Sequence, residues 1–234
     1  MHIETLEGRQ FLTATVVEGY PGYYEIHGDA SDDVIDVSVS QSGQSFTLDG
    51  TTYSNVAYIS VQGYGGDDFI SIHSDEGQGS IAAGVSAGDG RDTVLVNFDG
   101  AIWGGGDDDI LYLSDSFYGG VHGEDGNDRI YVSGFSLDSE VSGGSGHDYI
   151  DASGNYAGLA INGDGGKDTI YGTDYDDEIR GDSGEDELHG NGGNDTFYTR
   201  EQERDVIYGG DGTDIAYVDR DGDGTYDVEY VFYG

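Results

Sequence analysis

Aspartates and glycines recur at fixed spacing in this chain, and together they suit the binding of a hard divalent cation. Between Gly163 and Tyr198 the sequence divides into four consecutive units of nine residues, GDGGKDTIY, GTDYDDEIR, GDSGEDELH and GNGGNDTFY, and a fifth, GGDGTDIAY, starts at Gly209. In every unit the sixth residue is Asp and the eighth is apolar or small. Ca²⁺ takes roughly six to eight oxygen ligands from carboxylates and backbone carbonyls. Glycine lets a turn adopt the positive φ that points carbonyls inward at such an ion.

The same pattern continues upstream at wider spacing. Its Asp residues there are Asp32, Asp67, Asp92, Asp108, Asp128 and Asp148, and the residues two positions later are Val34, Phe69, Val94, Ile110, Ile130 and Ile150. All of these followers are apolar, although hydrophobic residues make up only 35% of the chain. We interpret each Asp as a turn residue and each apolar follower as part of a core.

The spacing of the motif predicts a coil. From Asp108 to Asp168 the motif Asp recurs every 20 residues, three times in succession, and the next step, to Asp186, is 18 residues. We therefore expect two columns of turns on opposite sides of a coil with 18–20 residues per circuit. One column contains Asp92, Asp108, Asp128, Asp148, Asp168 and Asp186, with Asp205 as its degraded end, and the other contains Asp177, Asp195 and Asp214.

Short strands are expected beside each turn. The segments DTVLVNF from Asp92 and DRIYVSG from Asp128 contain β-branched and aromatic residues with partial period-two alternation. No stretch of ten or more residues has the apolar period of a helix. The sequence therefore predicts parallel strands stacked by coiling, a β-solenoid nearly free of helix.

The charge balance excludes several classes of protein. Asp and Glu number 48 against 8 Lys and Arg, so the formal net charge is −40 at pH 7. Such a chain repels the phosphate backbone of nucleic acids, and no apolar run reaches the ~18 residues of a membrane span. Cys is absent, which excludes disulfide scaffolds, thiolate zinc sites and cysteine nucleophiles. Because the six His are dispersed and no G-x-S-x-G elbow or P-loop occurs, we expect no enzyme.

The nonapeptides resemble the G-G-x-G-x-D-x-U-x repeats of RTX (haemolysin-type) proteins, which form calcium-binding parallel β-rolls. The resemblance is strong over 163–198 and 209–217, good at WGGGDDDIL, GEDGNDRIY and GGSGHDYID (from 103, 123 and 143), and partial at Asp32 and Asp67. It implies that each ion lies between turns of successive rungs. The Ca²⁺ ligands that it implies are Asp92, Asp108, Asp128, Asp148, Asp168, Asp177, Asp186, Asp195 and Asp214, with Asp32, Asp67 and the third-position Asp89, Asp125, Asp174 and Asp211 as further candidates. Asp-Gly-rich turns also occur in metal-free β-helices, because such turns favour these residues.

The resemblance refines the expected fold to an all-β, right-handed parallel β-solenoid, in which a β-helix passes into an RTX-like β-roll with capping strands at both ends. The expected divisions are an N-terminal cap with irregular first rungs (1–60), a β-helix with ~20-residue rungs and one calcium edge (61–162), the β-roll (163–217), and an acidic loop with a C-terminal capping strand (218–234).

Stacked carboxylates make folding depend on the metal. Neighbouring strands lie about 4.8 Å apart, and each like-charge contact at that distance costs on the order of 1–4 kcal/mol. Calcium between the turns reverses the sign of this interaction. We therefore expect a chain that is largely unfolded without metal and folds cooperatively in millimolar Ca²⁺.

Two further motifs leave alternatives open. The segment DRDGDGTYD places Asp219, Asp221 and Asp223 like the first half of an EF-hand loop, but Tyr230 stands where the closing Glu is required, so a solvated acidic hairpin is the alternative. Tyr131, Tyr171, Tyr198 and Tyr217 each follow a motif Asp by three. They form either a packing ladder on the outer strand face or a surface that stacks on sugars or a second subunit.

The function expected from these features is that of a secreted or cell-surface protein that folds on Ca²⁺ and has a structural, adhesive or matrix role. Its expected partners are calcium ions, together with a second copy of itself, through end-to-end or edge-strand assembly, or a surface polysaccharide. RTX repeats imply bacterial type I secretion, and their sites fill at extracellular calcium concentrations. The alternatives are a secretion and folding module of a larger exoenzyme and a β-helix enzyme acting on polysaccharides.

Overall fold

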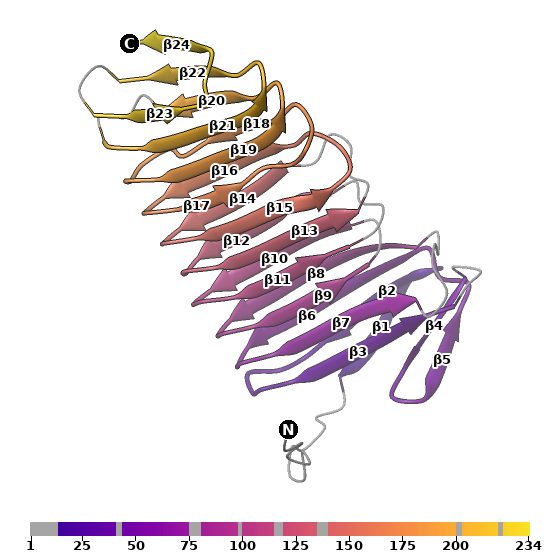
Figure 1. The fold of residues 1–234 in the computed structure, drawn as a ribbon. Coiled ribbons are helices and arrows are strands. Elements are labelled where there is room, and N and C mark those ends of the chain that lie inside the picture. Colours follow the sequence, from indigo (N-terminus) through magenta and orange to yellow (C-terminus); the bar gives the residue numbers. More distant parts are fainter. Residues whose placement is uncertain are drawn as a thin grey trace, which may run out of the picture.

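The computed structural model describes residues 14–40, 44–74, 81–97, 100–114, 119–134, 140–199, 203–219 and 222–234. Within these ranges every regular element is a β-strand, and the strands form two sheets of twelve (Figure 1). No helix in this part of the chain is long and apolar enough to cross a membrane.

The two sheets face each other and are stacked along the same axis. The first, sheet A, contains β1 (Thr15–Tyr20), β2 (Tyr23–His27), β6 (Tyr58–Gly65), β8 (Ala82–Asp89), β10 (Gly100–Gly106), β12 (Val121–Asp125), β14 (Glu140–Ser145), β16 (Ala160–Gly165), β18 (Glu178–Arg180), β20 (Thr196–Thr199), β22 (Ile215–Val218) and β24 (Tyr230–Tyr233), in this order. The second, sheet B, contains β5 (Thr51–Ser54), β4 (Ser45–Leu48), β3 (Val34–Val39), β7 (Phe69–Ser74), β9 (Thr93–Val96), β11 (Ile110–Leu113), β13 (Arg129–Gly134), β15 (Tyr149–Asn155), β17 (Thr169–Tyr171), β19 (Glu187–Gly193), β21 (Val206–Gly212) and β23 (Gly224–Tyr226), in this order.

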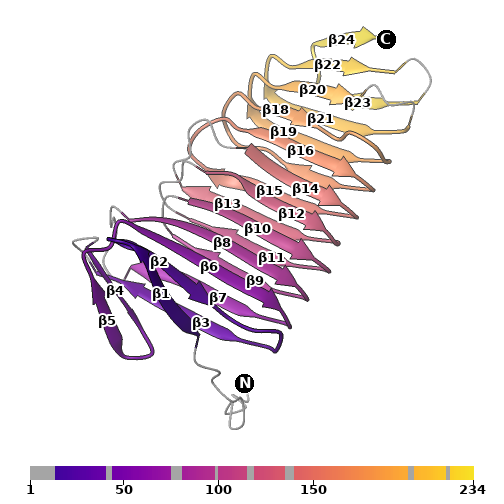
Figure 2. The same cartoon turned by 180° about the vertical axis from the view of Figure 1, so that it is seen from behind.

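From β6 onward the chain alternates between the sheets, and from β8 onward each strand pairs in parallel with the strand two places earlier. Thus β14 pairs with β12 and β15 pairs with β13. The result is a continuous coil that rises from the N-terminal end to the C-terminal end, as the views from opposite sides show (Figures 1 and 2). The prediction of an all-β parallel solenoid is confirmed.

The core is a double row of aliphatic side chains between the sheets. On sheet B, Ile130, Ile150 and Ile170 lie in register on successive strands and are fully buried. On sheet A, Ile179 and Phe197 are aligned in the same way. Burying each such side chain contributes roughly 1.5–3 kcal/mol, so alternation along a strand and stacking across rungs together hold the coil.

The N-terminal end is covered by antiparallel strands. Strand β1 pairs antiparallel with β2, and β3, β4 and β5 form a meander beside the first rung. Phe46 of β4 is buried, and its ring lies 5.4 Å from that of Tyr24 and 4.7 Å from that of Tyr53. At the C-terminal end β24 and β23 are the last strands of their sheets, with Tyr230, Phe232 and Tyr233 about half exposed.

Candidate calcium-binding turn columns

All motif turns lie where the chain crosses from one sheet to the other. Column one, which we define by the crossings from sheet A to sheet B, carries Asp92, Asp128, Asp148, Asp168, Asp186 and Asp205. Column two, defined by the crossings from sheet B to sheet A, carries Asp177, Asp195 and Asp214. The sequence spacing placed these residues on the same two sides.

The structure corrects the register of three predicted turns by one residue. In these three turns of column one the buried residues are Asp33, Asp68 and Asp109, whereas the predicted Asp32, Asp67 and Asp108 are exposed. The core residues shift with them, from Val34, Phe69 and Ile110 to the fully buried Ile35, Ile70 and Leu111. In each case two Asp are followed by two apolar residues, so the position of the Asp–apolar pair is ambiguous by one.

Each buried Asp joins its turn to the turn of the preceding rung through one carboxylate oxygen. In column one Oδ1 of Asp168 accepts from the backbone N–H of Asp148 at 2.8 Å, and Oδ1 of Asp148 accepts from that of Asp128 at 2.8 Å. In column two Oδ1 of Asp214 accepts from the N–H of Asp195 at 2.9 Å. The same bond links rungs from Asp33 to Asp223 in column one. The carboxylates thus form a ladder along each side of the coil.

The second carboxylate oxygen of most of these residues has no hydrogen-bond partner among the described residues. This orphaned Oδ2 is found in Asp68, Asp92, Asp109, Asp128, Asp148, Asp168, Asp186, Asp195 and Asp214. Their side chains are at most 3% exposed. A buried oxygen of an ionised carboxylate is costly unless it meets a proton or a cation. We call the turns of these nine residues the open turns.

Burial is the main reason that these carboxyls resist ionisation, and nearby carboxylates add to the effect. The pKa rises to about 8 for Asp109 and Asp168, to about 7 for Asp68, Asp128 and Asp195, and to about 6 for Asp92, Asp148 and Asp186. The pKa of Asp214 is also raised, again chiefly by burial. Without metal, the pKa values of Asp109 and Asp168 keep these two carboxyls mostly protonated at neutral pH, and ionising any carboxyl of the set costs more in the folded chain than in the unfolded one.

The backbone of every open turn has two left-handed residues, four and two positions before the Asp. The residues four positions before are Tyr64, Gly88, Gly105, Glu124, Gly144, Asp164, Asp182, Asn191 and Gly210, all with φ between 59° and 119°. Those two positions before are glycines with positive φ, except Asp107. Left-handed residues other than glycine cost of order 1–3 kcal/mol, so residues such as Tyr64 and Glu124 hold a conformation that something else must stabilise.

In every open turn except that of Asp92, which has Ala87 there, a glycine five residues before the Asp leaves space around the orphaned oxygen. A Cβ on Gly163 would lie 2.5 Å from Oδ2 of Asp168 and 2.7 Å from the carbonyl oxygen of Gly181 on the next rung. The same pair of oxygens surrounds Gly123, where the distances to Asp128 Oδ2 and the Gly143 carbonyl are 2.1 and 2.3 Å. A carboxylate oxygen and a carbonyl oxygen of the neighbouring rung thus border one space, a donor set that fits Ca²⁺.

Backbone carbonyls must supply much of any coordination here. In the part of the chain that the structure describes, no three His, Cys, Asp or Glu side chains converge on one point. An ion at an open turn would be held by the Asp Oδ2 and by carbonyls of its own and the adjacent turn. Ca²⁺ is the biological cation that accepts such a flexible set of oxygens.

Three further turns are completed by hydrogen bonds instead, and we call them closed turns. Oδ2 of Asp33 accepts from the N–H of Asp29 at 2.7 Å, and Oδ2 of Asp177 accepts from that of Thr173 at 2.6 Å. Oδ2 of Asp223 accepts from the N–H of Asp219 at 2.9 Å. In each case the donor lies four positions before the Asp and has no positive φ. In the open turns, where the residue at this position is left-handed, the Asp Oδ2 accepts no such bond.

The remaining predicted ligands lie on the surface. The third-position residues Asp89, Asp125, Asp174 and Asp211 are exposed at the tips of their turns. Asp67 and Asp108 form an outer ladder beside the buried one, in which Oδ1 of Asp67 accepts from the N–H of Arg91 at 3.1 Å and Oδ1 of Asp108 from that of Asn127 at 2.8 Å. These bonds hold the pKa of both carboxyls below its usual value.

The EF-hand-like segment forms the last turn of column one. Both oxygens of Asp223 accept backbone N–H groups, from Asp205 at 3.2 Å and from Asp219 at 2.9 Å. Oδ2 also accepts from the Thr199 hydroxyl at 3.1 Å. Asp221 lies outside the described residues. The segment thus extends the turn column, a role that its first-half EF-hand pattern does not predict.

Aromatic rings form a stack along the outer face of sheet B. The ring centroids are 4.5 Å apart for Tyr171–His189, 4.6 Å for His189–Tyr208 and 5.1 Å for Tyr208–Tyr226, with planes within 17° of parallel. Because each of the inner rings lies between two others, their faces are covered and only their edges point outward. This geometry favours the packing ladder over a platform for sugars.

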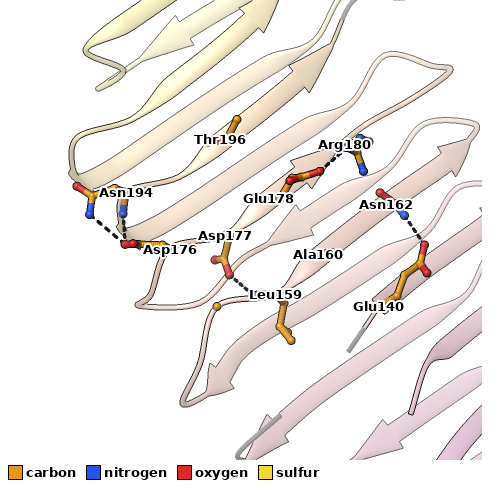
Figure 3. A pocket seen from close by; sticks show the side chains of 11 residues that line it. Glu140, Leu159, Ala160, Asn162, Asp176, Asp177, Glu178, Arg180, Asn194 and Thr196 are labelled. Atoms are coloured by element: carbon orange, nitrogen blue, oxygen red, sulfur yellow. Dashed lines mark hydrogen bonds and ion pairs between the residues drawn. The ribbon is translucent and has the colours of Figure 1, made fainter. Parts of the chain in front are cut away.

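A groove of about 710 Å³ lies on the outer face of sheet A beside column two (Figure 3). Its polar side chains pair with one another. The Nδ2 of Asn162 donates to Glu140 at 2.9 Å, Arg180 pairs with Glu178, and Asn194 donates to Asp176. Arg180 is the one cation among the lining residues, so the groove is poorly suited to an acidic polysaccharide.

Comparison with known families identifies the repeats. A model of the RTX calcium-binding nonapeptide repeat matches in four copies, over residues 121–136, 162–197 and 202–224. No curated protein matches the chain. The matched segments contain the turns of Asp128, Asp168, Asp177, Asp186, Asp195 and Asp214. The chain therefore contains RTX calcium-binding repeats folded as a parallel β-solenoid, and the resemblance seen in the sequence is confirmed.

Proposed function

We propose that this calcium-binding repeat protein is an extracellular scaffold that folds when Ca²⁺ bridges its rungs, and that its role is structural or adhesive. The observation that carries the proposal is the row of nine buried carboxylate oxygens that have no hydrogen-bond partner among the described residues. A hydrophobic core two side chains wide offsets little of the charge repulsion between rungs. A cation at each open turn converts that repulsion into cross-linking.

The location follows from calcium availability. Extracellular calcium modules bind with Kd of roughly 10⁻⁴–10⁻³ M, far above cytosolic calcium concentrations. A chain that folds only with calcium stays unfolded inside a cell and folds after export. RTX repeats with this behaviour support a secreted or surface-associated protein.

The test is a calcium titration of the full chain with folding and binding measured together. Far-UV circular dichroism reports β-structure, and equilibrium dialysis reports bound ions. We expect both to rise cooperatively in millimolar Ca²⁺ and to remain low with equal Mg²⁺, because Mg²⁺ demands octahedral geometry and keeps its waters. A β-spectrum that is unchanged in excess EDTA at neutral pH would contradict the proposal.

Self-assembly is a second element of the structural role. Strand β24 is the outermost described strand of sheet A at its C-terminal end, and Tyr230, Phe232 and Tyr233 on it are about half exposed. Such a strand can pair with another chain. Light scattering on calcium addition would show growth for the wild type and less growth for Val231→Pro, which removes one N–H from this strand.

A module of a larger exoenzyme is the other candidate, favoured by the RTX match itself. The two functions differ in what the gene encodes beside this segment. A catalytic domain fused to the repeats would favour the module, whereas further repeats or a surface anchor would favour the scaffold.

A further inference from the structure

We propose that calcium binds at the open turns only, and that each column begins at a closed turn, where a hydrogen bond replaces the ion. The ion-binding turns then extend beyond the recognised repeats. This inference rests on the calcium binding proposed above and assigns the turns that bind. Ions occupy the open turns from Asp68 to Asp186 in column one and those of Asp195 and Asp214 in column two. The turns of Asp33, Asp177 and Asp223 remain free of metal.

The first argument is the state of the second carboxylate oxygen. In the open turns Oδ2 is buried and has no partner among the described residues. In the closed turns the same atom accepts a short backbone hydrogen bond, at 2.7 Å in Asp33 and 2.6 Å in Asp177. Oδ1 of Asp177 accepts from the Leu159 N–H at 2.7 Å and the Thr173 hydroxyl at 3.1 Å, so this carboxylate is fully engaged (Figure 3). A cation would have to displace these bonds.

The second argument is the position of the closed turns. Asp33 is the first motif turn of column one and Asp177 the first of column two. An ion held between successive turns needs oxygens from both. The crossing before Asp177, from β15 to β16, contributes Leu159 to the column but no motif Asp. A hydrogen-bonded turn needs no neighbour, so it can begin the column without leaving a half-built site.

The third argument is the local sequence. The closed turns GDASDD (28–33) and GTDYDD (172–177) lack glycine at their second and fourth positions. All open turns have glycine at the fourth position except GGGDDD (104–109), which has the left-handed Asp107 there. The fourth-position glycine therefore distinguishes the two kinds of turn, because it permits the positive φ that the closed turns do not use.

The turns to which we assign calcium are not the same set as the recognised repeats: some lie outside the matched segments, and some matched turns receive no ion. The open turns of Asp68, Asp92, Asp109 and Asp148 lie outside the segments that match the RTX model, and we assign calcium to them. The turns of Asp177 and Asp223 lie inside matched segments, and we assign no ion to them. A repeat match and an ion-binding turn are thus separable properties.

The experiment compares Asp177→Asn with Asp195→Asn, neighbours in column two that each offer Oδ1 to the preceding rung. Asn keeps that acceptor and removes the charge. Calcium bound per folded chain, measured by equilibrium dialysis and elemental analysis in saturating Ca²⁺, should fall by at least one ion for Asp195→Asn and stay at the wild-type value for Asp177→Asn. An equal loss in both variants would overturn the inference.

A measurement on the wild type covers the case in which a variant fails to fold. Crystals grown with Ca²⁺ and measured for anomalous scattering should show ions beside Oδ2 of Asp68, Asp92 and Asp195 and none beside Oδ2 of Asp33 or Asp177. Ions at the closed turns, or ions restricted to the matched repeats, would overturn the inference and leave calcium binding intact. Absence of ions at every turn would overturn calcium binding as well.

Discussion

Acid should substitute for calcium in folding this chain. The perturbation is removal of calcium with EDTA followed by a change of pH, and the groups that respond are the buried Asp residues of the open turns. Their pKa values in the folded chain are about 6 to 8, against about 3.9 in an unfolded chain. A proton on Oδ2 removes the charge that calcium otherwise neutralises.

The magnitude follows from the pKa difference. At about pH 7 Asp168, whose folded pKa of about 8 makes it take up a proton on folding, lowers stability by roughly 4 kcal/mol, and Asp148, with a pKa of about 6, lowers it by roughly 3 kcal/mol. Over the open turns even a third of the total approaches about 10 kcal/mol, which equals the whole stability of an ordinary domain. The metal-free coil should therefore not persist at neutral pH.

The stability of the metal-free chain should change with pH in the opposite direction to that seen in ordinary acid unfolding. Because the folded pKa values are raised, this contribution to stability is fully present below about pH 4 and is lost as the pH rises through 6 to 8. In EDTA the β-signal in circular dichroism should be strong near pH 5, above the pI of about 4.1, and disappear by about pH 8. With saturating Ca²⁺ it should persist throughout, and calcium affinity should increase over the same pH range.

Two results would refute this reasoning. One is a metal-free chain that keeps its β-spectrum unchanged from about pH 5 to 8, since its carboxyls would then ionise without penalty. The other is a calcium affinity that does not vary with pH, which would separate ion binding from the buried carboxyls. The exposed Asp211 is a suitable control, because Asp211→Asn should leave both profiles unchanged.

Three substitutions test other parts of the structure. Asp168→Asn should stabilise the metal-free chain near pH 5 by about 1–2 kcal/mol and destabilise the calcium form, so urea midpoints with EDTA and with Ca²⁺ should shift in opposite directions. Gly163→Ala should destabilise the calcium form by about 1–3 kcal/mol, because its Cβ would lie 2.5 Å from Asp168 Oδ2. Gly165→Ala, where the nearest atom to the new Cβ is 3.5 Å away, should have little effect. Equal urea midpoints for the two variants would contradict the proposed space around Oδ2. Ile150→Ala should lower the free energy of unfolding by about 2–5 kcal/mol in a urea titration with Ca²⁺, because the fully buried side chain stacks between two other isoleucines. A small loss of stability would mean that the rungs can collapse around the cavity.

The periodic part of the fold could be predicted from the sequence because coiling repeats the same requirement at every rung. A step of 18–20 residues places Asp168 over Asp148 and Ile170 over Ile150, and the structure pairs these residues in that register. The antiparallel meander of β3, β4 and β5 has no repeat to reveal it. Its position depends on tertiary contacts such as that between Phe46 and Tyr24.

The register errors have a local cause. At GYGGDDFI the pairs Asp67–Phe69 and Asp68–Ile70 both satisfy an Asp–x–apolar pattern. Counting back five residues resolves the choice, because Gly63 lies opposite Oδ2 of Asp68, where a side chain would collide with it. The glycine that makes room for the carboxylate is therefore a better guide to register than the apolar residue that follows it.

The distinction between open and closed turns is harder to predict, because it depends on backbone φ. In GTDYDD the motif Asp177 and core Ile179 are both present, so the unit reads as a calcium repeat. Only the fourth position, where Tyr175 stands in place of glycine, indicates that the turn can direct the N–H of Thr173 to the carboxylate. One residue type thus separates a turn that requires an ion from one that does not.

Calcium at the open turns also leaves most of the surface charge in place. Nine divalent ions bring 18 positive charges against a formal net charge of −40, so the calcium form still carries about −22. This residual charge comes from exposed groups such as Asp89 and Asp211 at the turn tips. It keeps folded rods apart in dilute salt and weakens with screening over a Debye length of about 8 Å at physiological ionic strength. Pairing through β24 should therefore need both calcium, to form the strand, and salt, to let two acidic rods approach.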